Sequence, residues 1–300
     1  MAHPGSHRPI YEPHASELAT RGRGELGRSL SHWLGGLAIL ESLIGVIWQR
    51  LFARSLALDI PYTYSALLGL SLWLVYIADR WLDARRSRSI APLSARHELA
   101  FALGSWLVAA WCLVLLGTLA IASLTLDSDE WAIRVGLLLI TFGYFASVHW
   151  LKAAVPKEAL VTAIYTAGVT LYTWDKHAWT LLDPAPLLGV LAFALLVALN
   201  LGVISVREQD LDAKHGSRSI ALSFAHLARA CSILSATLCL ASLALSHTGG
   251  ASFQRWFYAV ASSSLALGLL PRVGKRFDLD AYHLLADATL LLALPFAWLC

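Results

Sequence analysis

Long apolar stretches alternate with short polar connections along most of the chain. They lie at residues 31–53, 61–80, 99–125, 132–151, 159–174, 186–206, 228–246, 254–270 and 282–299. A helix needs about 20 apolar residues to cross a hydrocarbon core roughly 30 Å thick. The pattern therefore predicts an all-α integral membrane protein with about nine transmembrane helices. The stretch at 159–174 is short, so about eight or ten spans remain alternatives.

Composition agrees with this pattern. Of the 300 residues, 57% are hydrophobic and 14% are charged, and the mean hydropathy is +0.61. These values lie beyond the balance of a soluble domain. We expect one transmembrane domain over residues 29–300, preceded by a polar, disordered cytoplasmic arm over residues 1–28. The four cysteines lack metal-type or disulfide-type spacing, and the net charge of +3 gives no support for nucleic-acid binding.

The positions of the basic residues predict the orientation. Most of the 23 Lys and Arg residues fall in the N-terminal arm and in the connections after the second, fourth, sixth and eighth apolar stretches. Positively charged connections stay on the cytoplasmic side. The N-terminus is therefore expected in the cytoplasm, and an odd number of spans places the C-terminus outside. In a bacterium the chain would lie in the inner membrane.

One short sequence occurs twice, after the second and after the sixth apolar stretch. The two copies are residues 82–91 (LDARRSRSIA) and 211–221 (LDAKHGSRSIA). Asp83 and Asp212 each follow another acidic residue by one helical turn, Asp79 and Glu208 respectively, so each copy presents two carboxylates on one helix face. A single such cluster is explained by a solvated helix end. Recurrence on the same membrane side favours a functional site.

Two facing carboxylate pairs suit divalent cations and a polyanion. Mg²⁺ prefers oxygen ligands, commonly one or two carboxylates with substrate phosphates and water. Basic side chains would neutralise the remaining charge of a bound diphosphate. Lys152 could reach such a group, or it could simply extend to the membrane interface. Glu41 lies inside the first apolar stretch, where it could face a cavity, be protonated or hydrogen-bond to another helix.

The pattern resembles the UbiA-type intramembrane prenyltransferase superfamily over about residues 30–299. The family's first motif is Asn-Asp-x-x-Asp-x-x-x-Asp; Asp79 and Asp83 match its second and third Asp, whereas Val75 and Tyr76 replace its Asn and first Asp. The second motif, Asp-x-x-x-Asp-x-x-x-Gly, is matched by Glu208, Asp212 and Gly216, with Glu for the first Asp. Residues 91–93 (APL) and 151–152 (LK) are similar to the family's Arg-Pro-Leu and Leu-Lys-Arg segments.

The resemblance implies about nine helices in two pseudo-repeated halves around a cytoplasm-facing cavity. The implied reaction is Mg²⁺-dependent transfer of a prenyl group from an allylic diphosphate to a lipophilic acceptor, often an aromatic ring, within the membrane. The implied metal-binding and catalytic residues are Asp79, Asp83, Glu208 and Asp212. The implied diphosphate-binding residues are Arg85, Lys152, Lys214 and Arg218, and Asn200, near the same helix face as Glu208, is a substitute for the missing Asn.

Two other functions remain open at this point. A membrane terpene cyclase would form the same carbocation and need no acceptor. A non-catalytic, lipid-binding relative would keep the acidic pairs only as polar helix ends, and the missing Asn and Asp favour this alternative. A secondary transporter is disfavoured, because the repeated charges lie at predicted cytoplasmic helix ends and not at the bilayer midplane. No protein partner is predicted.

Overall fold

Helices form all the regular secondary structure in the described part of the chain. The computed structural model describes residues 37–87, 95–150, 157–177, 184–215, 219–248 and 251–298. The predicted N-terminal arm, Lys152 and Arg218 lie outside these residues, as does the side chain of Lys214. Within the described ranges the expectation of an all-α fold is confirmed.

In the described residues, each apolar stretch coincides with helical structure. The elements are α2 (Ile39–Ser55), α3 (Tyr62–Ser87), α4 (Ala95–Thr125), α5 (Ser128–Phe145), a π-helical turn (Ala146–Trp150), α6 (Lys157–His177), α7 (Pro184–His215), α8 (Ile220–Ser223), α9 (Leu227–Thr248), α10 (Ala251–Val273), α11 (Leu279–Leu290) and α12 (Leu294–Trp298), with short 3₁₀ turns at Gly274–Arg276 and Leu291–Ala293. Six helical stretches of the described chain are long and apolar enough to cross a membrane: 62–85, 104–125, 128–148, 184–213, 227–248 and 279–298. A multi-pass membrane protein is therefore indicated.

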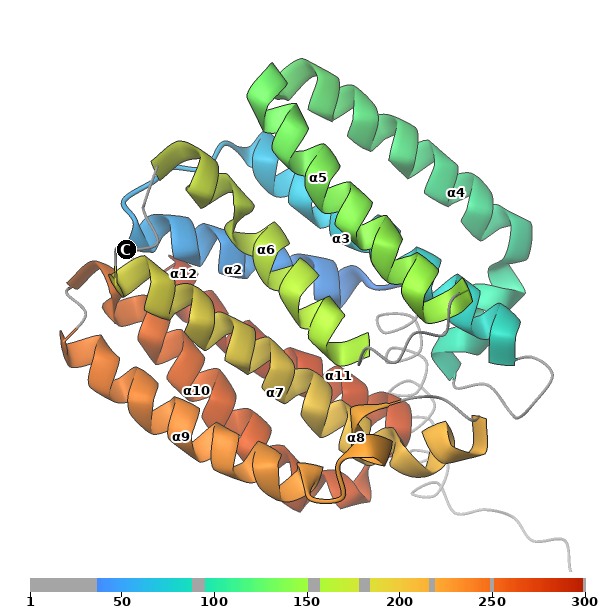
Figure 1. The fold of residues 1–300 in the computed structure, drawn as a ribbon, viewed down its shortest axis with the longest axis vertical. Helices are drawn as coiled ribbons and strands as arrows, with labels where there is room; N and C mark the ends of the chain where they lie inside the picture. Colours follow the sequence, from blue (N-terminus) through green and yellow to red (C-terminus); the bar gives the residue numbers. More distant parts are fainter. Residues whose placement is uncertain are drawn as a thin grey trace, which may run out of the picture.

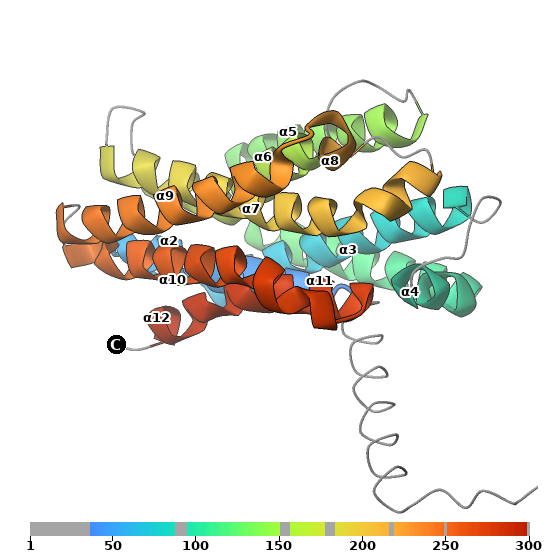
Figure 2. The same cartoon turned by 90° about the horizontal axis from the view of Figure 1, so that it is seen from below.

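The long helices run roughly along one direction and form a bundle (Figures 1 and 2). α3 packs against α4 and α2, while α7, α9 and α10 pack against one another. α2 and α6 lie between these two groups, because α2 also contacts α10 and α6 contacts α7. The C-terminal ends of α3, α5 and α7 and the N-terminal end of α6 gather at one end of the bundle (Figure 1). This end carries both acidic pairs.

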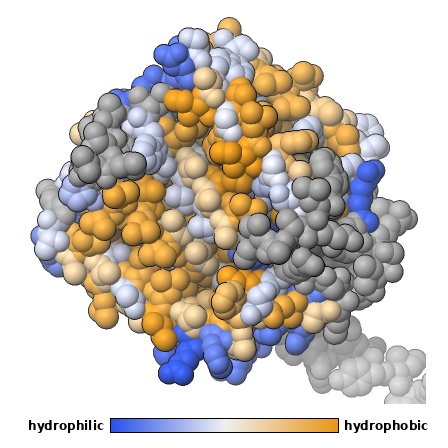
Figure 3. All heavy atoms as spheres, viewed as in Figure 1, coloured by the Kyte–Doolittle hydropathy of each residue, from blue (hydrophilic) through white to orange (hydrophobic). Residues whose placement is uncertain are grey.

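α4 and α5 expose most of their apolar surface. Only 17% of the apolar stretch in α4 and 11% of the stretch that begins with α5 are buried inside the protein. Leu116, Leu124 and Leu138 are among the exposed large side chains. Apolar residues dominate the face in Figure 3, and strongly hydrophilic ones lie toward its rim. A soluble monomer rarely exposes so much contiguous apolar surface, whereas lipid would cover it.

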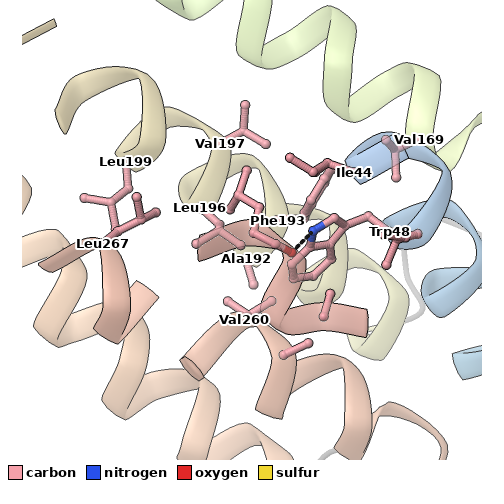
Figure 4. Packing of buried hydrophobic residues seen from close by; sticks show 14 of the residues in the cluster. Ile44, Trp48, Val169, Ala192, Phe193, Leu196, Val197, Leu199, Val260 and Leu267 are labelled. Atoms are coloured by element: carbon pink, nitrogen blue, oxygen red, sulfur yellow. Dashed lines mark hydrogen bonds between the residues drawn. The ribbon is translucent and has the colours of Figure 1, made fainter. Parts of the chain in front are cut away.

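Aromatic side chains join α2, α7 and α10 in the centre of the bundle. Trp48 is fully buried and packs on Phe193, with ring centroids 4.9 Å apart, and edge-on against Trp256 at 5.0 Å. Figure 4 shows Trp48 and Phe193 within this cluster. Both indole N–H groups donate to backbone carbonyls, Trp48 to Leu290 and Trp256 to Gly189, each at 3.1 Å. Satisfied indole donors allow these large side chains to be buried far from water.

The end opposite the acidic pairs is fixed around Glu130. Asp127 caps α5 in a capping box with Glu130, which satisfies otherwise unpaired N–H groups at the helix start. The Glu130 side chain is only 2% exposed. It accepts hydrogen bonds from the Tyr64 hydroxyl at 2.8 and 2.9 Å and pairs with Lys176 Nζ at 2.6 Å. One carboxylate thus ties the start of α5 to the start of α3 and the end of α6.

Candidate functional site

The first acidic pair, Asp79 and Asp83, lies in the last turns of α3. Because the two residues are four apart in a helix, their carboxylates share one face. Lys157, the first residue of α6, reaches both: its Nζ is 3.1 Å from Asp79 Oδ2 and 3.0 Å from Asp83 Oδ2. The Tyr144 hydroxyl donates to Asp79 Oδ1 at 3.0 Å. The pair therefore faces the junction of α5 and α6.

Lys157 is held as a cation between these groups. Burial lowers the pKa of Lys157, but the nearby Asp79 and Asp83 carboxylates raise it by more, so the pKa lies well above the usual value for Lys. About a third of the side chain (34%) remains exposed, so the ion pairs are not sealed from solvent. The positive charge persists throughout the neutral pH range.

The second acidic pair, Glu208 and Asp212, lies near the end of α7. His283 of α11 places its Nε2 3.0 Å from Glu208 Oε1. Asp212 interacts electrostatically with Glu208, with Glu158 and with Lys157. Lys157 therefore contacts the first acidic pair directly and lies within electrostatic range of the second. The structure brings the two acidic pairs to the same junction, with the start of α6 between them.

Glu158 connects the start of α6 to the segment that follows α7. Its Oε1 accepts hydrogen bonds from the Ile220 backbone N–H at 3.0 Å and from the Ser205 hydroxyl at 3.3 Å. Ser205 in turn accepts from the Ala221 N–H at 3.3 Å. These contacts give the second Ser-Ile-Ala sequence a structural role. Glu158 Oε2 is buried and has no hydrogen-bond partner in the described part of the protein.

Asn200 lies deeper in the bundle than the second acidic pair. It precedes Glu208 by about 12 Å along α7 at 1.5 Å per residue. Its Nδ2 donates to Asp287 Oδ1 at 3.0 Å. Both residues line a small cavity of about 20 Å³ with Tyr76 and Tyr165, a volume that suits roughly one water molecule. The Asn200 contacts thus lie in the bundle interior.

Glu41 of α2 also lines this cavity. Its carboxylate pairs with the Arg80 guanidinium, and both side chains are more than nine-tenths buried. Of the three expectations for Glu41, a hydrogen bond to another helix is confirmed, because Arg80 of α3 donates to its carboxylate. Glu41 and Arg80 are 39 residues apart in sequence, so no local pattern indicated this ion pair.

Arg85 points away from the carboxylates of α3. Its guanidinium stacks on the Trp81 ring at 3.7 Å. Both residues line a pocket of about 370 Å³ between α3 and α4, together with Gly104 and Val108. Gly104 adopts a φ of 46°, which other residues rarely tolerate, and it kinks α4 at this pocket. Arg85 thus faces a region separate from the acidic junction.

The two acidic pairs differ in their fitness for a divalent cation. Among the described side chains, no group of three or more His, Cys, Asp or Glu residues could hold a metal ion by itself. At the first acidic pair, Lys157 Nζ already lies between the carboxylates, so this pair does not fit a metal as arranged. The second acidic pair offers Glu208, whose Oε1 lies 3.0 Å from His283 Nε2, and Asp212, which is within electrostatic range of Glu158. Mg²⁺ needs only one or two carboxylates when phosphate and water complete its ligands.

Four residues at the junction escaped the sequence-based reasoning. They are Tyr144, Lys157, Glu158 and His283. Lys157 and Glu158 belong to the same connection as Lys152, and their position at the start of a helix was the available signal. His283 carried no sequence signal, because its pairing with Glu208 depends on how α11 packs against α7.

Comparison with known proteins provides no relative: no family model matches the chain, and no curated protein or solved structure matches it.

Proposed function

We propose that this protein is a UbiA-type membrane prenyltransferase that transfers a prenyl group from an allylic prenyl diphosphate to a lipophilic, aromatic acceptor. The observation that supports this most is the convergence of the two acidic pairs on the start of α6. Lys157 contacts Asp79 and Asp83 and interacts electrostatically with Asp212. The Lys157 ammonium, between two acidic helix ends, would bind a phosphate oxygen, and the carboxylates would bind the counter-ion of the diphosphate.

The polar residues at the junction would have separate roles. Glu208 and Asp212 would hold Mg²⁺, with Glu158 beside them. Lys157 would donate to a phosphate oxygen, and Lys152, Lys214 and Arg218 would neutralise the rest of the diphosphate. Bound Mg²⁺ would supply electrostatic stabilisation of the charge that develops on the departing diphosphate.

The surrounding helices would supply the apolar environment. The prenyl chain would lie along apolar helix surface or in lipid, and the carbon atom that loses the diphosphate would be shielded from water. The acidic junction would face the cytoplasm, with the N-terminus on the same side, in accordance with the distribution of basic residues. About nine spans in two pseudo-repeated halves would complete the proposed architecture.

Equilibrium binding tests the diphosphate site directly. Detergent-purified protein is titrated with a prenyl thiodiphosphate, whose C–S bond resists ionisation, with and without Mg²⁺. We expect Mg²⁺-dependent binding that is lost in Asp212→Ala. Asp210→Asn is the matched control, because Asp210 is an exposed carboxylate on the same helix between Glu208 and Asp212. Equal binding by wild type and Asp212→Ala would rule out the proposed site.

Turnover then separates the alternatives. A prenyltransferase releases diphosphate only when an acceptor is present and yields a prenylated product. Diphosphate release with a cyclised hydrocarbon, without an acceptor, would instead establish a terpene cyclase. Binding of the analogue without any release across a panel of phenolic and quinone-precursor acceptors would favour a non-catalytic, lipid-binding relative.

A further inference from the structure

Lys157 occupies the space that a cation would need at the first acidic pair. Its Nζ lies 3.1 Å from Asp79 Oδ2 and 3.0 Å from Asp83 Oδ2. A Mg²⁺ ion bound to both carboxylates would stand about 2.1 Å from an oxygen of each. Such an ion and the ammonium group cannot share this position. Mg²⁺ could enter only if the Lys157 side chain left.

Asp79 is already fully engaged by protein groups. Its Oδ1 accepts from the Tyr144 hydroxyl at 3.0 Å, and its Oδ2 pairs with Lys157. A carboxylate whose two oxygens both have donors does not require a metal ion to be satisfied. The two donors come from α5 and α6, so the packing of three helices builds this arrangement.

The local sequence also removes oxygen ligands from the first acidic pair. Tyr76 precedes Asp79 by nearly one helical turn, and its ring lies against Tyr165, with the ring centroids 6.5 Å apart. Tyr76 lines the interior cavity. Val75 has no polar side-chain atom. Neither residue adds a carboxylate or amide oxygen at this point, so the first acidic pair offers a divalent ion only two carboxylates, both already paired with Lys157.

The second acidic pair has other partners. Glu208 Oε1 lies 3.0 Å from His283 Nε2, and Asp212 is within electrostatic range of Lys157. The direct ion pairs of Lys157 are with Asp79 and Asp83. The ammonium group is therefore the cation of the first acidic pair.

We propose that Lys157 is a built-in replacement for a divalent cation at the first acidic pair, so that no divalent ion binds between Asp79 and Asp83. The ammonium group has three N–H donors. Two point to the carboxylates, and the third would serve a phosphate oxygen. The phosphate part of this inference rests on the proposed function; the exclusion of a divalent ion rests on the position of Lys157 Nζ.

The test measures how much Mn²⁺ the protein binds. Mn²⁺ is a paramagnetic substitute for Mg²⁺, and its EPR signal reports the ion that remains free, so the bound amount follows by difference. Purified protein is titrated with Mn²⁺ alone and in the presence of a prenyl thiodiphosphate. We expect Lys157→Met to bind about one equivalent of Mn²⁺ more than wild type, because the first acidic pair is then open to one hard divalent ion. Lys275→Met, an exposed lysine in a 3₁₀ turn, is the control and keeps the wild-type value.

Asp83→Asn provides a second test that does not depend on the folding of Lys157→Met. The inference expects Asp83→Asn to bind as much Mn²⁺ as wild type, because no ion occupies the first acidic pair. Loss of a bound ion in Asp83→Asn, or equal Mn²⁺ binding by folded Lys157→Met and wild type, overturns it. If the thiodiphosphate fails to bind under every condition, the proposed function fails, and the titration with Mn²⁺ alone still decides the role of Lys157.

Discussion

The ion pair between Glu41 of α2 and Arg80 of α3 provides a sharp test of the packing inside the bundle. The exposed fractions of the two side chains are 9% and 8%. Arg80→Met removes the cation, keeps much of the side-chain volume, and leaves the Glu41 carboxylate in the interior. The Tyr165 hydroxyl donates to the Glu41 backbone carbonyl at 3.1 Å, so that contact survives either side-chain substitution.

The size of the effect follows from burial. Removing one partner of a buried ion pair costs about 3–5 kcal/mol, whereas replacing both by apolar residues of similar volume is often neutral or stabilising. A change of 1 kcal/mol shifts Tm by about 2–4 °C in domains of 150–250 residues. We therefore expect Arg80→Met to lower Tm by at least about 6 °C, and the double variant with Glu41→Leu to recover most of this loss.

Intrinsic fluorescence is a suitable measure of unfolding in detergent, because Trp48 and Trp256 are fully buried. The control is Arg255→Met, which removes an exposed arginine from α10 and should change the free energy of unfolding by less than about 0.5 kcal/mol. If Arg80→Met unfolds at the wild-type temperature, the pair is not buried as described. If the double variant is as unstable as the sum of the two single variants, the two side chains do not interact.

Two further substitutions test the close approach of helices and the second acidic pair. Gly268→Ala would place a Cβ against the Ser235 hydroxyl and should destabilise the protein by about 1–3 kcal/mol. The control is Gly117→Ala, whose Cβ meets open space and which should be neutral or stabilising by up to about 1 kcal/mol. Thermal unfolding measures both. Glu158→Gln should reduce the rise in Tm that Mg²⁺ produces, which for a saturating ion at 100 times its Kd corresponds to about 2.7 kcal/mol. An equal Mg²⁺ response in wild type and Glu158→Gln would show that the cation binds elsewhere.

The helices were predictable because their apolar stretches are long and their polar connections short. Nine spans were predicted, and six helical stretches of the described chain are long and apolar enough to cross a membrane. Another difference concerns where two helices end. α3 continues to Ser87 and α7 to His215, beyond the predicted span ends at 80 and 206. The apolar pattern measures only the part in lipid, whereas the helix itself continues into the charged sequence. Because α3 and α7 continue as helices, the two carboxylates of each acidic pair share one helix face, as their spacing indicated.

The partners of these carboxylates could not be predicted. Lys157 meets Asp79 and Asp83 across more than 70 residues of sequence, and no local pattern encodes a contact between the start of one helix and the end of another. Arg85 is close to the first acidic pair in sequence but not in space. It follows Asp83 by two residues, which directs it to the other side of α3, and there it stacks on Trp81. Sequence proximity to the acidic pair was not proximity in space.

The departures from the UbiA-type motif that the sequence resembles are mutually consistent. Where that motif has an Asp, Tyr76 lines the interior cavity. Where oxygen ligands are fewer, Lys157 and Tyr144 supply donors to the two remaining carboxylates of α3. Loss of a metal ion without compensation would leave Asp79 and Asp83 close together without a cation between them. Lys157 Nζ lies 3.1 and 3.0 Å from these carboxylates, so a protein ammonium already balances their charge. This compensation is the reason to expect a divalent ion at the first acidic pair only after Lys157 is replaced.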